Sequence, residues 1–203
     1  MKNILNVGCG KTRIPNSIGL DSVRLKGYTD VVHDLNTIPY PFKSNSFNEV
    51  HLYHVLEHLE KPLAVLEELH RIMKKDGILH IRTPHFSSKG AFTDPTHIRP
   101  FAIGSFDYFE PSSYYHFYTK VAFIISHKQI YYLGTYSDQS EYARYIMKFK
   151  NGSFVITFER MMNWLINGNQ FLFERFWCYW VGGANEIYVA MKKSQQARTN
   201  GKN

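Results

Sequence analysis

Cysteine and long apolar runs are both scarce in this sequence of 203 residues. The two cysteines, Cys9 and Cys178, stand far apart, and Cys9 lies in a glycine-rich turn, so a disulfide scaffold is not expected. No window approaches the ~18 consecutive apolar residues of a membrane span. The apolar run at the N-terminus is too short for a secretory signal. These absences predict a soluble, cytoplasmic protein.

Acidic residues are outnumbered, since 24 Lys and Arg face 17 Asp and Glu and give a formal net charge of +7. Residues 192–203 contribute four basic residues and no acid, which leaves 20 minus 17, or +3, for the rest of the chain. That balance is too mild for a nucleic-acid groove, and we expect no nucleic-acid partner. We expect a basic, disordered tail over residues 192–203. Because 44% of the residues are hydrophobic and 16% are aromatic, the remainder can form a packed core.

Short apolar segments alternate with turns through the first half of the chain. This pattern predicts strands over residues 3–7, 17–21, 29–33, 48–53 and 78–83. A helix is expected over residues 61–75, because Pro62 suits a first turn, an apolar stripe follows it, and Gly77 comes after its basic end. Strands separated by helical or turn segments predict an α/β fold, a doubly wound, Rossmann-like and mostly parallel sheet.

The second half is less regular and richer in aromatic residues. We predict a single domain over residues 1–191, with a motif-bearing core at 1–84 and a packed, substrate-side insertion at 85–120. Residues 121–191 would add strands and an aromatic helix. The segments expected there are a strand at 121–133, a hairpin at 144–158 about Asn151-Gly152, a helical stretch at 158–180 and a strand at 186–192.

A glycine turn follows the first predicted strand. Gly8 and Gly10 would let a ligand approach the backbone closely and would offer it N–H groups. A dinucleotide fingerprint needs a third glycine where this chain has Arg13, and no P-loop spacing is present. Asp21 and Asp34 each end a predicted parallel strand, at the sheet edge where open α/β sheets bind ligands. Such carboxylates can accept hydrogen bonds from ribose hydroxyls and from an adenine amine.

The order and spacing of these segments resemble the class I S-adenosylmethionine-dependent methyltransferases, especially a small group often found with sugar and cell-envelope gene sets. The resemblance spans about residues 3–110. It is carried by Leu5-Asn-Val-Gly-Cys-Gly10, Gly19-Leu-Asp21, Val32-His-Asp-Leu35, Pro41-Phe-Lys-Ser-Asn-Ser-Phe47, His54-Val-Leu-Glu-His58, Leu69-His-Arg-Ile-Met-Lys-Lys-Asp-Gly77 and Asp94-Pro-Thr-His97.

The resemblance implies S-adenosylmethionine as cofactor and assigns its contacts. The implied contacts are Gly8, Cys9 and Gly10 with the methionine part, Asp21 with the ribose, Asp34 and Leu35 with the adenine, and Tyr53 and His54 with the methionine end and the substrate. The link from Gly10 to Asp21 is too short for a full crossover helix, and no helix precedes the first strand to cover the cofactor. Residues 86–118 or a second subunit would then have to close the site.

The resemblance also implies transfer of the methyl group to an oxygen or nitrogen nucleophile of a small molecule or glycan. The sulfonium is already activated, so the protein needs mainly to position the acceptor and to remove its proton. Histidine is the usual base near neutral pH, and the candidates are His54, His97 and His85. For each of them a purely structural role is the alternative, and His58 is expected to pin the turn before Pro62.

Two other functions stay open at this stage. A catalytically silent module would bind the cofactor without turnover. A metal-dependent hydrolase would use the H-x-x-E-H pattern of His54, Glu57 and His58, which needs both histidines on one face of a helix. The pattern leaves a strand directly and Pro62 starts the next helix, so there is little room for that helix. No metal site is therefore expected.

Aromatic residues crowd the stretch from 158 to 180. They would either pack on the sheet as core or form a surface that lies on a membrane or against a second copy of the chain. The positive charges of the predicted tail would favour contact with anionic lipid. Peripheral membrane contact and a homodimer are therefore both hypotheses from the sequence.

Overall fold

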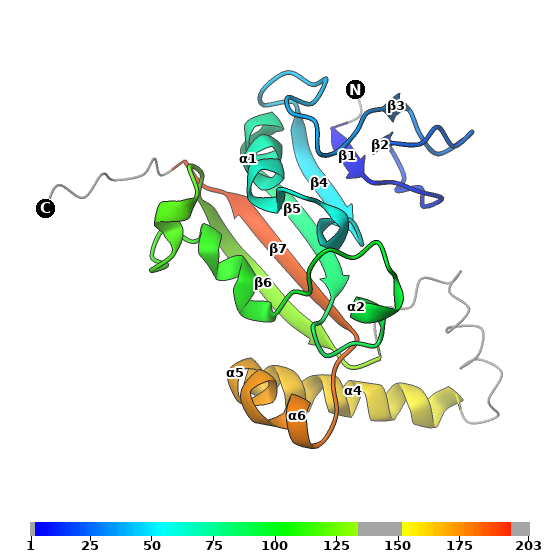
Figure 1. Ribbon diagram of the computed structural model, residues 1–203, viewed down its shortest axis with the longest axis vertical. Helices are drawn as coiled ribbons and strands as arrows, with labels where there is room; N and C mark the ends of the chain where they lie inside the picture. The colour runs from blue at the N-terminus through cyan, green and yellow to red at the C-terminus, as the bar shows by residue number, and fades with distance from the viewer. Residues whose placement is uncertain (1–2, 134–151, 196–203) are drawn as a thin grey trace, which may run out of the picture.

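The computed structural model describes residues 3–133 and 152–195. Within them a sheet of seven strands runs in the order β3-β2-β1-β4-β5-β7-β6 (Figure 1). The strands are β1 Ile4–Val7, β2 Ser17–Asp21, β3 Val31–Val32, β4 Phe47–Tyr53, β5 Met73–Pro84, β6 Phe123–Tyr131 and β7 Glu186–Lys193. The first five pair in parallel, whereas β7 pairs antiparallel with both β5 and β6. The predicted doubly wound, mostly parallel α/β fold is confirmed.

The ends of β1 and β4 lie side by side, because Val7 pairs with Leu52. Both residues are fully buried, as expected for central strands of a parallel sheet. The segments that follow them, the glycine turn after β1 and the chain from His54 onward, therefore leave the sheet at the same edge. This is the edge at which open α/β sheets bind ligands.

Helix α1, Pro62–Ile72, is shorter than the sequence predicts. Instead of continuing to residue 75, the chain enters β5 at Met73, which is fully buried and pairs with Phe47. Gly77 lies inside β5 rather than ending a helix, and a Cβ there would come within 3.2 Å of Asn48 O. Burial of Met73 in the sheet thus overrides the helical propensity of the segment.

The predicted packed insertion contains only short helices, α2 Gly90–Thr93, η2 Ile103–Phe109 and η3 His116–Tyr118. Phe101, Phe106 and Phe109 are buried in the core, which agrees with a packed rather than a disordered stretch. Figure 1 shows this green segment looping around α2 near the ends of β5 and β7 and then running back beside β6.

The predicted hairpin at 144–158 is wrong over residues 152–158, which begin helix α4, Gly152–Gly168. Residues 144–151 lie outside the described part of the chain. Helical structure then continues as α5 Gln170–Leu172, η4 Phe173–Trp177 and α6 Cys178–Trp180, so the helical prediction for 158–180 is largely confirmed. Asn-Gly is a strong hairpin signal only between two strands, and here it precedes an aromatic helix.

Helix α4 covers the open edge of β6. Asn163 accepts a hydrogen bond from the Tyr132 amide at 2.8 Å, and Asn167 both accepts from the Ile130 amide (2.8 Å) and donates to its carbonyl (2.7 Å). Because Asn163 and Asn167 are four residues apart, they lie on one face of the helix. Their amides satisfy backbone groups that an edge strand would otherwise leave unpaired.

The basic tail predicted over residues 192–203 starts too early in the sequence, because β7 extends to Lys193. Lys192 and Lys193 belong to β7, and Lys193 is buried, with its Nζ donating to Met73 O at 2.7 Å and to Asn45 Oδ1 at 3.1 Å. The prediction for residues 196–203 lies outside the described part of the chain. No helix of residues 3–133 or 152–195 is both long and apolar enough to span a bilayer.

Candidate active site

The glycine turn after β1 requires glycine for two physical reasons. Gly8 has a φ of 62° and Gly10 a φ of 48°, both in the left-handed region. A Cβ at Gly8 would also lie 2.2 Å from Val55 Cγ2, so the turn packs directly against the segment after β4. The amides of Gly8 and Cys9 both donate to Leu20 O, which fixes the turn to β2.

Asp21, at the end of β2, binds the same turn. Its Oδ2 accepts from the Gly10 amide at 2.8 Å, and its Oδ1 accepts from the Val23 amide at 3.0 Å. Each carboxylate oxygen has two lone pairs, so each keeps one for a further donor such as a ribose hydroxyl. The predicted ribose contact fits this geometry and stays a prediction.

Asp34 and Leu35 follow β3. The Asp34 carboxylate accepts from the Asn36 amide and from Thr37 Oγ1, both at 3.0 Å, and these bonds lower the pKa of the carboxyl group. Leu35 is buried, and its carbonyl accepts from Tyr40 Oη. Asp34 is therefore an ionised, exposed acceptor on an ordered turn, and its predicted adenine contact stays a prediction.

The side chains of Tyr53 and His54, at the end of β4, lie in different places. Tyr53 stays with the sheet, where its hydroxyl lies 2.8 Å from His51 Nδ1 and the Arg82 guanidinium sits 5.2 Å from its ring. His54 adopts a left-handed φ of 54°, which turns its side chain away from the strand pattern. Its Nε2 lies 2.8 Å from Glu186 Oε1. Of this pair only His54 lines the cavity described next.

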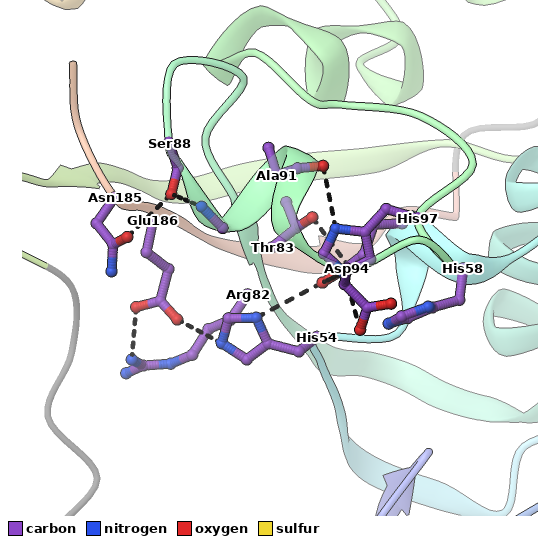
Figure 2. Close-up of polar contacts among 12 residues, drawn as sticks. His54, His58, Arg82, Thr83, Ser88, Ala91, Asp94, His97, Asn185 and Glu186 are labelled. Carbon is purple, nitrogen blue, oxygen red and sulfur yellow. Dashed lines mark hydrogen bonds and ion pairs between the residues drawn. The ribbon is translucent and has the colours of Figure 1, made fainter. Parts of the chain in front are cut away.

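A cavity of about 680 Å³ opens beside His54. Most of its lining residues have polar side chains, and Figure 2 shows several of them converging from the end of β4 and from the segment around α2. The lining residues are His54, Glu57, His58, Pro84, Ser88, Gly90, Thr93, Asp94, Pro95, His97 and Asn185.

Glu57 is the most deeply placed of these residues, with only 2% of its surface exposed. Its Oε2 accepts from Thr83 Oγ1 at 3.0 Å, but its Oε1 has no hydrogen-bond partner. That oxygen faces His54 Nδ1 at 3.5 Å and His97 Nε2 at 3.9 Å. A buried carboxylate oxygen that has an ion pair with His54 but no hydrogen bond keeps lone pairs for another group, so the site can receive one.

His54 is a cation in this arrangement. Burial by itself would lower its pKa, but the hydrogen bond to Glu186 and the contact with Glu57 outweigh burial and raise the pKa to about 9. At neutral pH the ring is then protonated on both nitrogens and donates hydrogen bonds. In this state the ring must lose that proton before it can act as a base, and the predicted role of His54 as a general base stays a prediction.

The ring nitrogens of His97 and His58 are oriented by neighbours. His97 Nδ1 lies 3.2 Å from Ala91 O, a pure acceptor, so Nδ1 carries the proton and Nε2 the lone pair in the neutral ring. Thr96 Oγ1 donates to Asp94 Oδ1 at 2.7 Å and lies 2.9 Å from His58 Nδ1. This arrangement makes His58 Nδ1 a donor too and leaves its Nε2 as an acceptor.

His85 lies outside the cavity and is fully buried. Its Nδ1 accepts from the Ser87 amide at 3.2 Å, and its Nε2 lies 3.0 Å from Glu174 Oε1. Nε2 thus connects the residue after β5 to Glu174 of the C-terminal helical segment, and Nδ1 binds the turn at Ser87. The predicted catalytic role of His85 is not supported, since neither nitrogen reaches the cavity.

Two functional candidates were not expected in these roles. In the sequence, Glu57 stands out only as part of the H-x-x-E-H pattern of metal-dependent hydrolases. The helix that this pattern needs is replaced by a single 3₁₀ turn, Leu56–His58. Glu186 gives no local signal in the sequence. It reaches His54 because β7 inserts beside β5 and pairs Glu186 with Pro84.

Comparisons with known proteins agree with this geometry. Residues 20–81 match a family described as a methyltransferase domain. Two solved structures are similar along 94% of this chain. One is a S-adenosylmethionine-dependent methyltransferase from Archaeoglobus fulgidus, at 16% identity, 85% coverage of its chain and a TM-score of 0.55. The other is such an enzyme from Mesorhizobium loti, at 13% identity, 90% coverage and a TM-score of 0.51. No curated protein matches the chain.

A third similar structure is the [4+2]-cyclase SpnF, at 14% identity and a TM-score of 0.52 over 94% of this chain and 73% of its own. Structures this distant establish the fold, and the family match adds the methyltransferase domain. The fold is thus that of class I S-adenosylmethionine-dependent methyltransferases, and residues 20–81 match a methyltransferase domain. The predicted fold is confirmed, and these matches support the predicted family, enzyme class and cofactor.

Proposed function

We propose that this methyltransferase acts on an oxygen or nitrogen nucleophile of a small molecule or glycan that enters the cavity beside His54. The observation that carries the proposal is the buried Oε1 of Glu57, which makes no hydrogen bond, in a cavity next to the glycine turn. Gly8 packs on Val55, the residue after His54, so the cofactor loop and the cavity are neighbours in space.

The cavity offers what an acceptor hydroxyl or amine needs. Glu57 Oε1 and His97 Nε2 present lone pairs to an O–H or N–H group, while the His54 cation, held by Glu186 and Glu57, supplies a positive charge beside them. In the reaction the S–CH₃ bond breaks, an O–CH₃ or N–CH₃ bond forms, and the acceptor loses its proton. S-adenosylhomocysteine is the second product. Positioning and proton removal are the protein's main contributions.

The size and polarity of the cavity support an acceptor of one or two sugar rings. A volume of about 680 Å³ lies within the range of small-molecule sites. Its lining contains three histidines, two acids, Ser88, Thr93 and Asn185, which can hydrogen-bond the hydroxyl groups of a sugar, whereas the apolar part of the lining can contact the ring face. Such an acceptor agrees with the resemblance to envelope- and glycan-associated relatives.

The test has two stages. Titration calorimetry with S-adenosylhomocysteine should first show one binding site per chain. Tritium transfer from labelled S-adenosylmethionine is then measured on defined mono- and disaccharides and amino sugars. Glu57→Gln and His97→Asn should lower turnover by about 10²-fold or more, with unchanged S-adenosylhomocysteine binding, whereas the exposed His127→Asn on β6 should leave both unchanged.

Each outcome separates the alternatives. Absence of S-adenosylhomocysteine binding would contradict the cofactor site itself. Binding without transfer to any acceptor would favour the silent module. Equal loss of cofactor binding and turnover in Glu57→Gln would mean that the cavity serves the cofactor rather than the acceptor.

We also propose a cytoplasmic location. The thiols of Cys9 and Cys178 are both free, which fits a reducing compartment. Fractionation of cells that produce the tagged protein checks this, and recovery from an oxidising compartment would contradict it.

A further inference from the structure

We infer that the cavity binds a divalent transition-metal ion through Glu57, His58 and His97, with open coordination positions that face the acceptor. This inference rests on the proposed function, because the ion would lie where the acceptor enters. It adds a metal site that neither the sequence argument nor the family match assigns.

The three side chains are close enough to share one ion. One ligand atom from each lies within 4.8 Å of the other two, and Glu57 Oε1 is 3.9 Å from His97 Nε2. Two donors at ~2.0–2.1 Å from a tetrahedral zinc ion are about 3.4 Å apart. A contraction of about half an ångström would therefore bring this pair to ligand distance.

The ring planes do not exclude a shared ion. The rings of His58 and His97 have centroids 4.6 Å apart and an interplanar angle of 71°. A metal ion must lie near the plane of each imidazole that binds it, and planes that are not parallel, unlike those of stacked rings, allow one ion to satisfy both.

Each proposed ligand already has the neighbour that orients metal ligands in proteins. Ala91 O holds His97 Nδ1, Thr96 Oγ1 holds His58 Nδ1, and Thr83 Oγ1 holds Glu57 Oε2. These bonds leave Nε2 of both rings and Oε1 of the carboxylate for the ion. Oε1 makes no hydrogen bond and has the ion pair with His54 at 3.5 Å, so it still has a lone pair for an ion.

A second group, Glu49, His51 and His80, has similar spacing but the wrong geometry. The two rings are stacked at 4.7 Å with an interplanar angle of 13°, so their lone pairs lie in nearly parallel planes. His51 Nε2 is already 2.7 Å from Glu49 Oε1. This group satisfies itself as a hydrogen-bonded ladder and provides a matched internal control.

The ligand set indicates the kind of ion. Two imidazoles and one carboxylate favour Zn²⁺, Fe²⁺ or Mn²⁺ over Mg²⁺ and Ca²⁺, which prefer all-oxygen sites. Three protein ligands leave at least one position open, as in metal sites that bind a substrate. An acceptor with a hydroxyl or a vicinal diol could fill it.

The test uses the whole chain, stripped with a chelator and titrated with ZnCl₂ and, separately, MnCl₂. We expect one ion per chain, with metal–ligand distances of ~2.0–2.1 Å for zinc by X-ray absorption. Glu57→Gln, His58→Asn and His97→Asn should each weaken binding at least tenfold, whereas His51→Asn and His80→Asn should not. Thermal melts of all five variants control for folding.

Absence of stoichiometric binding, or loss of binding in His51→Asn but not in His97→Asn, would overturn the inference. S-adenosylhomocysteine titration of the stripped protein keeps the two proposals apart. Cofactor binding without metal binding would leave the proposed function standing and remove the ion. Metal binding without cofactor binding would keep the ion site and contradict the proposed methyltransferase function.

A second, independent inference concerns an aromatic surface on α4 to α6, and we propose that it contacts a bilayer of anionic lipid. Figure 1 shows these helices together at one end of the molecule, beyond the end of the sheet. The surface comprises the exposed side chains of Trp164, Leu165, Phe171, Leu172, Phe176, Tyr179, Trp180 and Val181. Trp164 and Trp180 are 75% and 85% exposed, so the prediction that the whole block packs as core does not hold.

The charges around this surface favour lipid over other occupants. Residues 156–181 contain two exposed cations, Arg160 and Arg175, and their two acids are turned inward. Glu159 is buried, and Glu174 binds His85 and the Ile103 amide. Exposed Trp, Tyr and Phe flanked by arginine are typical of surfaces that lie in a lipid headgroup region.

Vesicle flotation tests this surface with phosphatidylcholine alone and with added phosphatidylglycerol. Binding should need the anionic lipid, fall at least tenfold in Trp164→Ser/Trp180→Ser, weaken in Arg160→Gln/Arg175→Gln, and persist in Phe92→Ser, an exposed aromatic on α2. Absence of flotation would overturn the proposal. A dimer in sedimentation that the double tryptophan variant separates would assign the surface to a second copy instead.

Discussion

The Gly10 amide donates to Asp21 Oδ2 across 2.8 Å, and this bond joins the turn after β1 to the end of β2. Residues 8–16 between the two strands contain turns and no helix. The carboxylate therefore does part of what a crossover helix would do, since it fixes the position of the turn. The same group is the predicted ribose ligand, so the shape of the loop and cofactor binding are coupled at Asp21.

This coupling predicts different effects for two substitutions of Asp21. Asp21→Ala removes the acceptor for Gly10 and the ribose ligand together and should weaken S-adenosylhomocysteine binding by about 10- to 100-fold. Asp21→Asn keeps one carbonyl oxygen, so its affinity for S-adenosylhomocysteine should lie between that of Asp21→Ala and that of the native protein. Calorimetry gives the affinities, and Asp76→Asn, at an exposed left-handed position, is the control. Native affinity in Asp21→Ala would show that the turn and the ribose do not depend on this carboxylate.

The contact of Gly8 with Val55 predicts a compensating pair. Gly8→Ala should be destabilising through the left-handed backbone, by about 1–2 kcal/mol, and through the 2.2 Å contact with Val55 Cγ2, by about 1–3 kcal/mol. Adding Val55→Ala should relieve the second part only. Gly10→Ala meets no atom within 4 Å and should show the backbone part alone. Urea denaturation of the four variants measures the cycle, and simple additivity would contradict the contact.

The positions of residues at the ends of the parallel strands could be predicted from the sequence, because they depend on local apolar periodicity. The second strand has the bounds that its apolar run indicates and the first differs by one residue, and Gly8, Gly10 and Asp21 lie together because each stands at or just after a strand end in a parallel sheet. Periodicity and strand order are enough for such residues, since the ends of parallel strands always meet at one edge.

Residues that depend on tertiary pairing could not be predicted in the same way. Glu186 reaches His54 only because β7 inserts antiparallel between β5 and β6, and His85 turns inward because Glu174 lies opposite it. Lys193 was assigned to a solvated tail because lysine is usually exposed. Its position is set by partners more than a hundred residues away in the chain.

Burial of Lys193 predicts a pH effect on stability. Burial lowers the pKa of its amine below the ordinary value of 10.5, so in the interval between the two values the unfolded chain holds the proton more tightly than the folded one. The free energy of unfolding should therefore rise with pH across that interval and level off above about 10.5. Lys193→Met lacks the group, and the difference between its urea denaturation curves and those of the native protein isolates the effect. If the free energy of unfolding of the native protein, relative to that of Lys193→Met, fell as the pH rises, folding would favour the ammonium form of Lys193 instead.

Asn167 should be the most sensitive position in the contact between α4 and β6. Asn167→Ala removes the partner of both the amide and the carbonyl of Ile130, which is fully buried. Each buried group left without a partner costs about 1–3 kcal/mol, so the melting temperature should fall by several degrees. Asn48→Ala, at an exposed position on β4, is the matched control. Hydrogen exchange adds a local readout, because the Ile130 amide should lose protection in Asn167→Ala before the central strand residue Val50 does. If both amides kept their native protection, the side chain of Asn167 would not be what closes the edge of the sheet.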